Sequence, residues 1–222
     1  MLDSGLFGRF YQFGETVLLL LYVNLLWISF TLLGGILFGV GPSTVAMFAV
    51  FRKWSMGEGD LPVFKFFWSI YRKEFLRANV LGLLLLIFGY MLYVNFNFLT
   101  LTNIVGESIL RIFLIFASIV YVLSIIYIFP MFVHYENKMT GYFKNAILLA
   151  IYSPIRTGYL IAACLTLYYF YFYFPVFIFF IGGSLTSLVI MYISYRTFLR
   201  VEYKQEVLNN YESEEERASI TT

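Results

Sequence analysis

Few side chains in this sequence could perform chemistry. His134 is the single histidine and lies two residues before Glu136, and Cys164 is the single cysteine. One histidine and one cysteine cannot supply the ligands of a typical zinc site, and the sequence contains neither a Walker-type phosphate loop nor a GxSxG nucleophile motif. His134 with Glu136 is the only candidate acid–base pair, and a lone histidine at a membrane edge is more often passive. We therefore expect no catalysis, no cofactor and no metal ion.

The composition excludes a soluble protein. Of the 222 residues, 61% are hydrophobic, 22% are aromatic and only 13% are charged, whereas a typical globular domain has about 25% charged residues. So few charges cannot cover the surface of a soluble enzyme or form the basic surface of a nucleic-acid binder. The mean hydropathy of +0.81 instead predicts an all-α, polytopic membrane helical bundle.

Long stretches without Asp, Glu, Lys or Arg locate the membrane spans, because a charge at the centre of a span costs about 2.5–3.5 kcal/mol. A span needs roughly 20 apolar residues. The longest such stretch, 157–195, is too long for one span and is interrupted by Pro175. We predict five spans in a single membrane domain of residues 1–200, followed by a cytoplasmic polar tail of residues 201–222. The spans are residues 16–37, 79–101, 112–133, 158–174 and 176–198.

The distribution of basic residues predicts the orientation of these spans. Thirteen of the fifteen Lys and Arg residues fall on one side of the predicted topology, and Arg9 and Arg111 fall on the other. Basic residues accumulate on the cytoplasmic side of a membrane. We expect the N-terminus outside and the C-terminus in the cytoplasm.

The first predicted cytoplasmic loop holds two helical segments. Residues 43–53 form a helix too short to cross a membrane, and residues 62–78 form a basic amphipathic helix. Its basic residues share one face, at positions Lys65, Arg72, Lys73 and Arg77. Such a helix suits the surface of an anionic membrane, which is the favoured interpretation, and a docking surface for a partner is the alternative. A third short helix is expected near residues 141–151.

Polar residues within the spans offer a weaker signal. The spans contain no charged residue away from their ends, which disfavours the usual designs for proton-coupled transport. Asn24, Asn95 and Asn97 could line a polar cavity, although hydrogen bonds between helices are the commoner use of such residues. The small-residue pairs Gly35 with Gly39 and Gly183 with Ser187 predict close helix packing.

Aromatic residues are concentrated before and after Pro175. Ten of the thirteen residues from 168 to 180 are aromatic. An aromatic belt at the outer membrane interface accounts for the position of this segment. Its density also fits a surface that stacks against sugars, and the candidate residues for such a surface are Tyr168, Tyr169, Tyr171 and Tyr173.

The first 80 residues contain five short motifs in this order: Asn24-Leu25-Leu26-Trp27, Gly41-Pro42-Ser43-Thr44-Val45-Ala46, Phe51-Arg52-Lys53-Trp54, Gly57-Glu58 and Phe66-Phe67-Trp68. In these motifs the sequence resembles the YesL-like family of bacterial integral membrane proteins, whose function is unknown. Ser43 stands where the family usually has alanine. No active site accompanies these motifs. Members of this family often occur beside sugar ABC transporters, which implies an accessory role in carbohydrate use and a place in the bacterial cell membrane.

The function expected from these observations is that of a non-catalytic accessory or regulatory component of a bacterial carbohydrate uptake system. Its expected partners are the lipid bilayer and a sugar ABC transporter permease or membrane sensor, and nucleic acid is not expected. Two alternatives stay open: a small permease that moves a polar solute itself, and a membrane enzyme. The sequence leaves the oligomeric state open.

Overall fold

The computed structural model describes residues 6–101 and 107–220, and all regular structure within them is helical. The elements in chain order are α1 (Leu6–Leu33), α2 (Val40–Ser55), α3 (Val63–Lys73), α4 (Phe75–Leu101), α5 (Glu107–His134), α6 (Met139–Tyr152), α7 (Pro154–Tyr173), the π-helical turn η1 (Ile178–Gly182) and α8 (Gly183–Ile220). The predicted all-α membrane fold is confirmed.

Four helical segments of the described residues are long and apolar enough to cross a membrane. They are Phe10–Leu33, Phe75–Leu99, Ser108–His134 and Ile178–Tyr211. A fifth span results if the pair Met139–Tyr152 and Pro154–Tyr173, bent by 101°, is counted as one. The predicted spans at 16–37, 79–101, 112–133 and 176–198 fall on the first four segments, and the predicted span at 158–174 falls on α7.

The turn between α1 and α2 corrects one prediction. Gly35 has a φ of +71° and lies in this turn with Gly39, outside both helices. These two glycines therefore do not form a helix-packing pair, and Gly35 supplies a left-handed backbone conformation that glycine adopts without steric cost. Gly183 does pack closely on another helix, because a Cβ added there would lie 3.2 Å from Oδ1 of Asn24 on α1.

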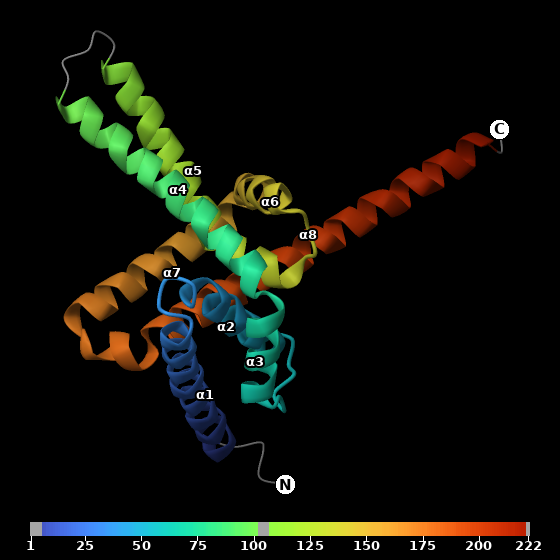
Figure 1. Ribbon diagram of the computed structural model, residues 1–222. Coiled ribbons are helices and arrows are strands. Elements are labelled where there is room, and N and C mark those ends of the chain that lie inside the picture. The colour runs from blue at the N-terminus through green and yellow to red at the C-terminus, as the bar shows by residue number, and fades with distance from the viewer. Residues whose placement is uncertain (1–5, 102–106, 221–222) are drawn as a thin grey trace.

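Helix α2 forms the centre of the molecule (Figure 1), where α1, α3, α4, α5 and α8 all contact it. Nearly every residue from Gly41 to Phe51 is buried. The predicted helix at 43–53 is present, but it fills the core instead of lying in an exposed loop. Its apolar sequence is too short for a span and is buried by neighbouring helices. Trp27 Nε1 on α1 donates a hydrogen bond to Thr44 Oγ1 on α2 at 3.1 Å.

The predicted helix at 62–78 is in fact two helices. Helix α3 ends at Lys73, Glu74 caps it with a φ of −98° and ψ of 9°, and α4 begins at Phe75. The prediction of one continuous helix is therefore wrong, and Arg77 belongs to α4. The basic residues continue at helical spacing across Glu74, so the charge pattern alone gave no sign of the break.

The helices form arms that leave the α2 core in different directions (Figure 1). One arm is the α4–α5 hairpin, a second contains α7 and the start of α8, and α1 forms a third. Helix α8 continues as a long rod beyond the other helices. The residues predicted as a polar tail, 201–222, continue α8 as far as Ile220, and the helix predicted near residues 141–151 is α6.

Candidate functional site

His134 belongs to a polar cluster that joins three helices. Arg52 Nε on α2 donates to His134 Nδ1 at 3.1 Å, and His134 Nε2 lies 3.3 Å from Glu202 Oε1 on α8. Tyr135 donates its hydroxyl proton to the same Glu202 oxygen at 2.6 Å. The His134 ring also stacks on Phe198, with centroids 4.9 Å apart. The cluster therefore joins α2, the end of α5 and the middle of α8.

The hydrogen bonds in this cluster define the role of His134. Arg52 can only donate, so His134 Nδ1 accepts and the proton of the neutral ring lies on Nε2, facing Glu202. Both ring nitrogens are engaged, and the side chain is only 9% exposed. Burial, with a further contribution from the hydrogen bond to Glu202, raises the pKa of Tyr135, which stays a hydrogen-bond donor at physiological pH. This arrangement ties helices together and leaves no ring nitrogen available as a base.

The carboxylate beside His134 is not Glu136, the partner predicted from the sequence. Glu136 lies exposed, whereas the partner is Glu202, which is 68 residues away. Phe198 and Glu202 are four residues apart and so share a face of one helix. This spacing alone does not link that face to His134. Among the described residues, no group of three or more His, Cys, Asp or Glu side chains could hold a metal ion.

Asn24 stabilises an irregular segment at the start of α8. Its Nδ2 donates to the carbonyl of Phe179 at 2.7 Å, and its Oδ1 accepts from the backbone N–H of Ser184 at 3.1 Å. Phe179 lies within η1, and a π-helical turn leaves backbone groups outside the regular α-helical pattern. The buried amide of Asn24 thus binds one backbone group of η1 and one at the start of α8.

The three asparagines considered for a polar cavity lie in different parts of the molecule. Asn24 lies between α1 and η1, whereas Asn95 and Asn97 are exposed near the far end of the α4 arm (Figure 1). Asn95 donates to the carbonyl of Met91, and Asn97 donates to that of Tyr93, each within its own helix. Within one chain, these residues do not line a common wall.

The basic residues of the predicted amphipathic helix are all exposed. Lys65, Arg72 and Lys73 lie on α3, and Arg77 lies at the start of α4. Lys73 Nζ and Arg77 NH1 each lie 3.8 Å from a carboxylate oxygen of Glu74. The break at Glu74 therefore separates Arg77 from the other three cations but keeps it beside them.

The aromatic residues before Pro175 are mostly on the outside of α7. Tyr168, Tyr169 and Tyr173 are exposed, whereas Tyr171 turns inward and donates to the carbonyl of Gly182 at 3.1 Å. Tyr168 and Tyr171 also line a cavity of about 490 Å³ beside η1. The outward tyrosines fit either a membrane belt or a stacking surface, and both readings stay predictions.

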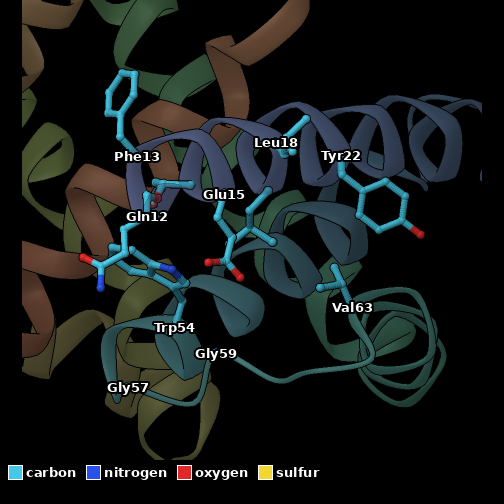
Figure 2. Close-up of a pocket in the computed structure, with 11 residues that line it drawn as sticks. Gln12, Phe13, Glu15, Leu18, Tyr22, Trp54, Gly57, Gly59 and Val63 are labelled. Carbon is cyan, nitrogen blue, oxygen red and sulfur yellow. Dashed lines mark hydrogen bonds between the residues drawn. The ribbon is translucent and has the colours of Figure 1, made fainter. Parts of the chain in front are cut away.

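An open cavity of about 850 Å³ lies between α1 and the α2–α3 connection. Figure 2 shows Gln12 and Glu15 extending from α1 toward Trp54 and Gly59. Glu15 is the carboxylate among the side chains that line this open cavity. Acid–base chemistry needs a second titratable group, and among the described residues no second carboxylate, histidine or lysine lines this cavity. The cavity instead shows which segments of the chain lie on the same side of the fold.

This cavity bears on the orientation of the chain. It brings the first half of α1 next to Trp54, Gly57 and Gly59, because α2 folds back antiparallel along α1. The predicted topology placed the N-terminus outside and residues 54–59 in the cytoplasm. The contact instead favours the same side for both segments, and the assignment of sides stays a prediction.

Comparison with known proteins gives the family. A family model described as "Protein of unknown function, DUF624" matches residues 20–96. The uncharacterized protein YesV of Bacillus subtilis (strain 168) is 37% identical over 189 residues, which cover 85% of this chain and 90% of the relative. The chain belongs to the DUF624 family. The matched segment of this DUF624 protein contains α2, α3, the second half of α1 and most of α4, which includes most of the helical core.

Two further relatives from Bacillus subtilis (strain 168) support the assignment. The uncharacterized protein YteU is 36% identical over 202 residues, covering 91% of this chain and 90% of the relative. The uncharacterized protein YesL is 29% identical over 195 residues, covering 88% and 92% respectively. The resemblance to the YesL-like family is thus confirmed. No solved structure matches the chain.

Proposed function

We propose that this DUF624 protein is a non-catalytic accessory or regulatory component of a bacterial carbohydrate uptake system. It acts by docking to another membrane protein, a sugar transporter permease or a membrane sensor. The docking surface is the basic face of α3, formed by Lys65, Arg72 and Lys73.

The packing of α3 is the observation that carries this proposal. A helix lying on a membrane buries its apolar face in lipid. In α3, Phe67 and Tyr71 are buried inside the protein, where their rings lie 5.2 and 5.1 Å from that of Phe30 on α1. Tyr71 also donates to the carbonyl of Phe30 at 3.2 Å. Because part of the apolar face is already occupied, the cations on the opposite face remain available for a partner.

The polar clusters support a role without catalysis. His134 has both ring nitrogens engaged and contacts Arg52 and Glu202. Cys164 is partly buried on α7, in an apolar sequence that suits packing. The link to carbohydrate rests on the association of YesL-like proteins with sugar ABC transporters, and the link to a membrane partner rests on α3.

A permease acting alone has less support. Transport of a polar solute needs polar groups along one path through the membrane. Asn24 uses its amide on η1 and α8, and Asn95 and Asn97 bond to their own helix far from it. A path formed between two copies of the chain would be needed to bring such groups together.

Purification in mild detergent tests the proposal. The tagged protein is isolated from its own bacterium grown on a carbohydrate. Three forms are compared: the wild type, the double variant Lys65→Gln/Arg72→Gln, and the control Lys138→Gln/Lys144→Gln, which removes two exposed cations elsewhere. We expect the wild type and the control to retain a transport or sensor protein that the α3 variant loses.

Two results would contradict the proposal. One is repeated recovery of the wild-type protein without any other membrane protein. The other is uptake of a labelled sugar by vesicles that contain only this protein, which would establish it as a permease. The α3 variant should keep the unfolding temperature of the wild type, since both altered side chains are exposed.

A further inference from the structure

A small cavity lies at the sharp corner between α6 and α7, where both meet α8. Its volume is about 160 Å³, and its cationic lining residues are Arg156 on α7 and Arg200 and Lys204 on α8. Cavities for drug-sized ligands usually have about 300–1,000 Å³. This cavity therefore suits one small charged group and is too small for a sugar or a nucleotide.

The cations around this cavity gather on one face of α8. Arg196, Arg200 and Lys204 are spaced four residues apart, and helical residues at that spacing are neighbours. Arg156 joins them from α7 by donating a hydrogen bond to the backbone carbonyl of Arg196. Lys204 Nζ lies 5.5 Å from the ring centroid of Tyr152, at the end of α6. Helices α7 and α8 thus place three positive side chains around the cavity, and Arg196 lies one turn away on α8 with its guanidinium 4.4 Å from the ring centroid of Tyr192.

No carboxylate neutralises this group within the described part of the chain. The salt bridges found there join Lys53 to Glu58, Lys73 and Arg77 to Glu74, and His134 to Glu202. None of them involves Arg156, Arg196, Arg200 or Lys204. Like charges four residues apart repel, so an anion bound between them would relieve the repulsion.

We propose that this corner binds the phosphate group of an anionic phospholipid. Arginine and lysine are the residues that bind phosphate oxygens most strongly, and basic pockets between membrane helices recognise lipid headgroups.

The surface next to the cavity indicates a lipid and not free phosphate. Ile155 is 74% exposed, Tyr159 67% and Leu199 45%. These apolar side chains lie beside the cations on α7 and α8, and α7 continues from there as an apolar helix. A phospholipid matches both features, because its headgroup meets the cations while its acyl chains cover the apolar side chains.

Native mass spectrometry of the full-length protein tests this proposal. The protein in detergent is titrated with phosphatidylglycerol, with phosphatidylcholine, and with phosphatidylglycerol in the presence of millimolar inorganic phosphate. We expect preferential binding of phosphatidylglycerol that inorganic phosphate does not displace. The variant Arg200→Gln/Lys204→Gln should bind phosphatidylglycerol at least about tenfold more weakly, because each basic residue near an anionic surface contributes about 1 kcal/mol.

Matched variants make the result specific to this corner. The variant Arg200→Lys/Lys204→Arg keeps both charges and should bind like the wild type, and the control Lys138→Gln/Lys144→Gln should do so as well. Undiminished binding by Arg200→Gln/Lys204→Gln would overturn the proposal, and so would equal affinity for phosphatidylcholine. Displacement of the lipid by inorganic phosphate would show that the corner binds a soluble anion, and it would overturn the proposal of a phospholipid site.

Discussion

At the scale of single residues, buried polar side chains connect helices through hydrogen bonds. Asn24 was recognisable from the sequence as a polar residue inside a span, but its partners were not. They are backbone groups 155 and 160 residues away, on η1 and at the start of α8. No local pattern near Asn24 indicates contact with that distant segment. The same distance in sequence hid Glu202 from His134.

Replacing Asn24 tests whether its side chain connects α1 to η1 and α8. Asn24→Leu removes two hydrogen bonds and leaves the Phe179 carbonyl and the Ser184 N–H without this partner. We expect a loss of roughly 1–3 kcal/mol in the free energy of unfolding, since hydrogen bonds between membrane helices average about 0.6 kcal/mol and reach about 1.7. Asn95→Leu is the matched control, because Asn95 bonds only to its own helix. Thermal unfolding in detergent measures both, and equal midpoints would contradict the assigned role.

The His134 cluster gives a second prediction at this scale. Glu202→Leu removes the oxygen that accepts a hydrogen bond from Tyr135 and that contacts His134. The polar atoms of these two partly buried side chains then lose this partner. We expect a destabilisation of about 1–3 kcal/mol, with a lower unfolding temperature. Glu202→Gln keeps an acceptor oxygen and should lose less. Glu136→Leu, at an exposed position, should change little; if it matched Glu202→Leu, the long-range pairing would be wrong.

At the scale of elements, the absence of charge predicted α4 and α5 well. Apart from the first residues of each helix, both lie in long uncharged stretches, and a charge near the middle of either would be costly. The same reasoning could not predict the place of α2, because a segment shorter than a span can be a surface helix or a buried one. It also missed the break at Glu74, which follows from how Phe67 and Tyr71 pack on α1.

The crossing of α2 and α4 can be tested at a glycine. A Cβ at Gly41 would lie 2.9 Å from the backbone oxygen of Ala78, whereas a Cβ at Gly82 on α4 would meet nothing within 4 Å. We expect Gly41→Ala to destabilise the protein by about 1–3 kcal/mol, because two backbones must move apart. Gly82→Ala should be neutral or stabilising. Unfolding midpoints in detergent measure the stability of both variants. An unchanged midpoint for Gly41→Ala would show that α2 and α4 cross elsewhere.

At the scale of the whole molecule, the fold predicts which segments share a side of the membrane. Gln12 and Gly57 line the same cavity. In a Cys164→Ser background, the pair Gln12→Cys and Gly57→Cys should therefore be joined by a short bismaleimide in intact membranes. The pair Gln12→Cys and Ile109→Cys is the control, since Ile109 lies at the far end of the α4–α5 arm (Figure 1). Failure of the first pair to cross-link would restore the topology predicted from basic residues.

Between residues 6 and 101 and between 107 and 220, we identify no set of side chains that would explain a function by itself, which is why a partner is central to the proposal. Photo-cross-linking in living cells tests this claim most directly, with a photoreactive residue at Ser69, an exposed position on α3. The proposal predicts a covalent adduct with a second membrane protein. This adduct should weaken in Lys65→Gln/Arg72→Gln and be absent from position 86, an exposed leucine on the α4 arm. Adducts with lipid alone at Ser69 would contradict it.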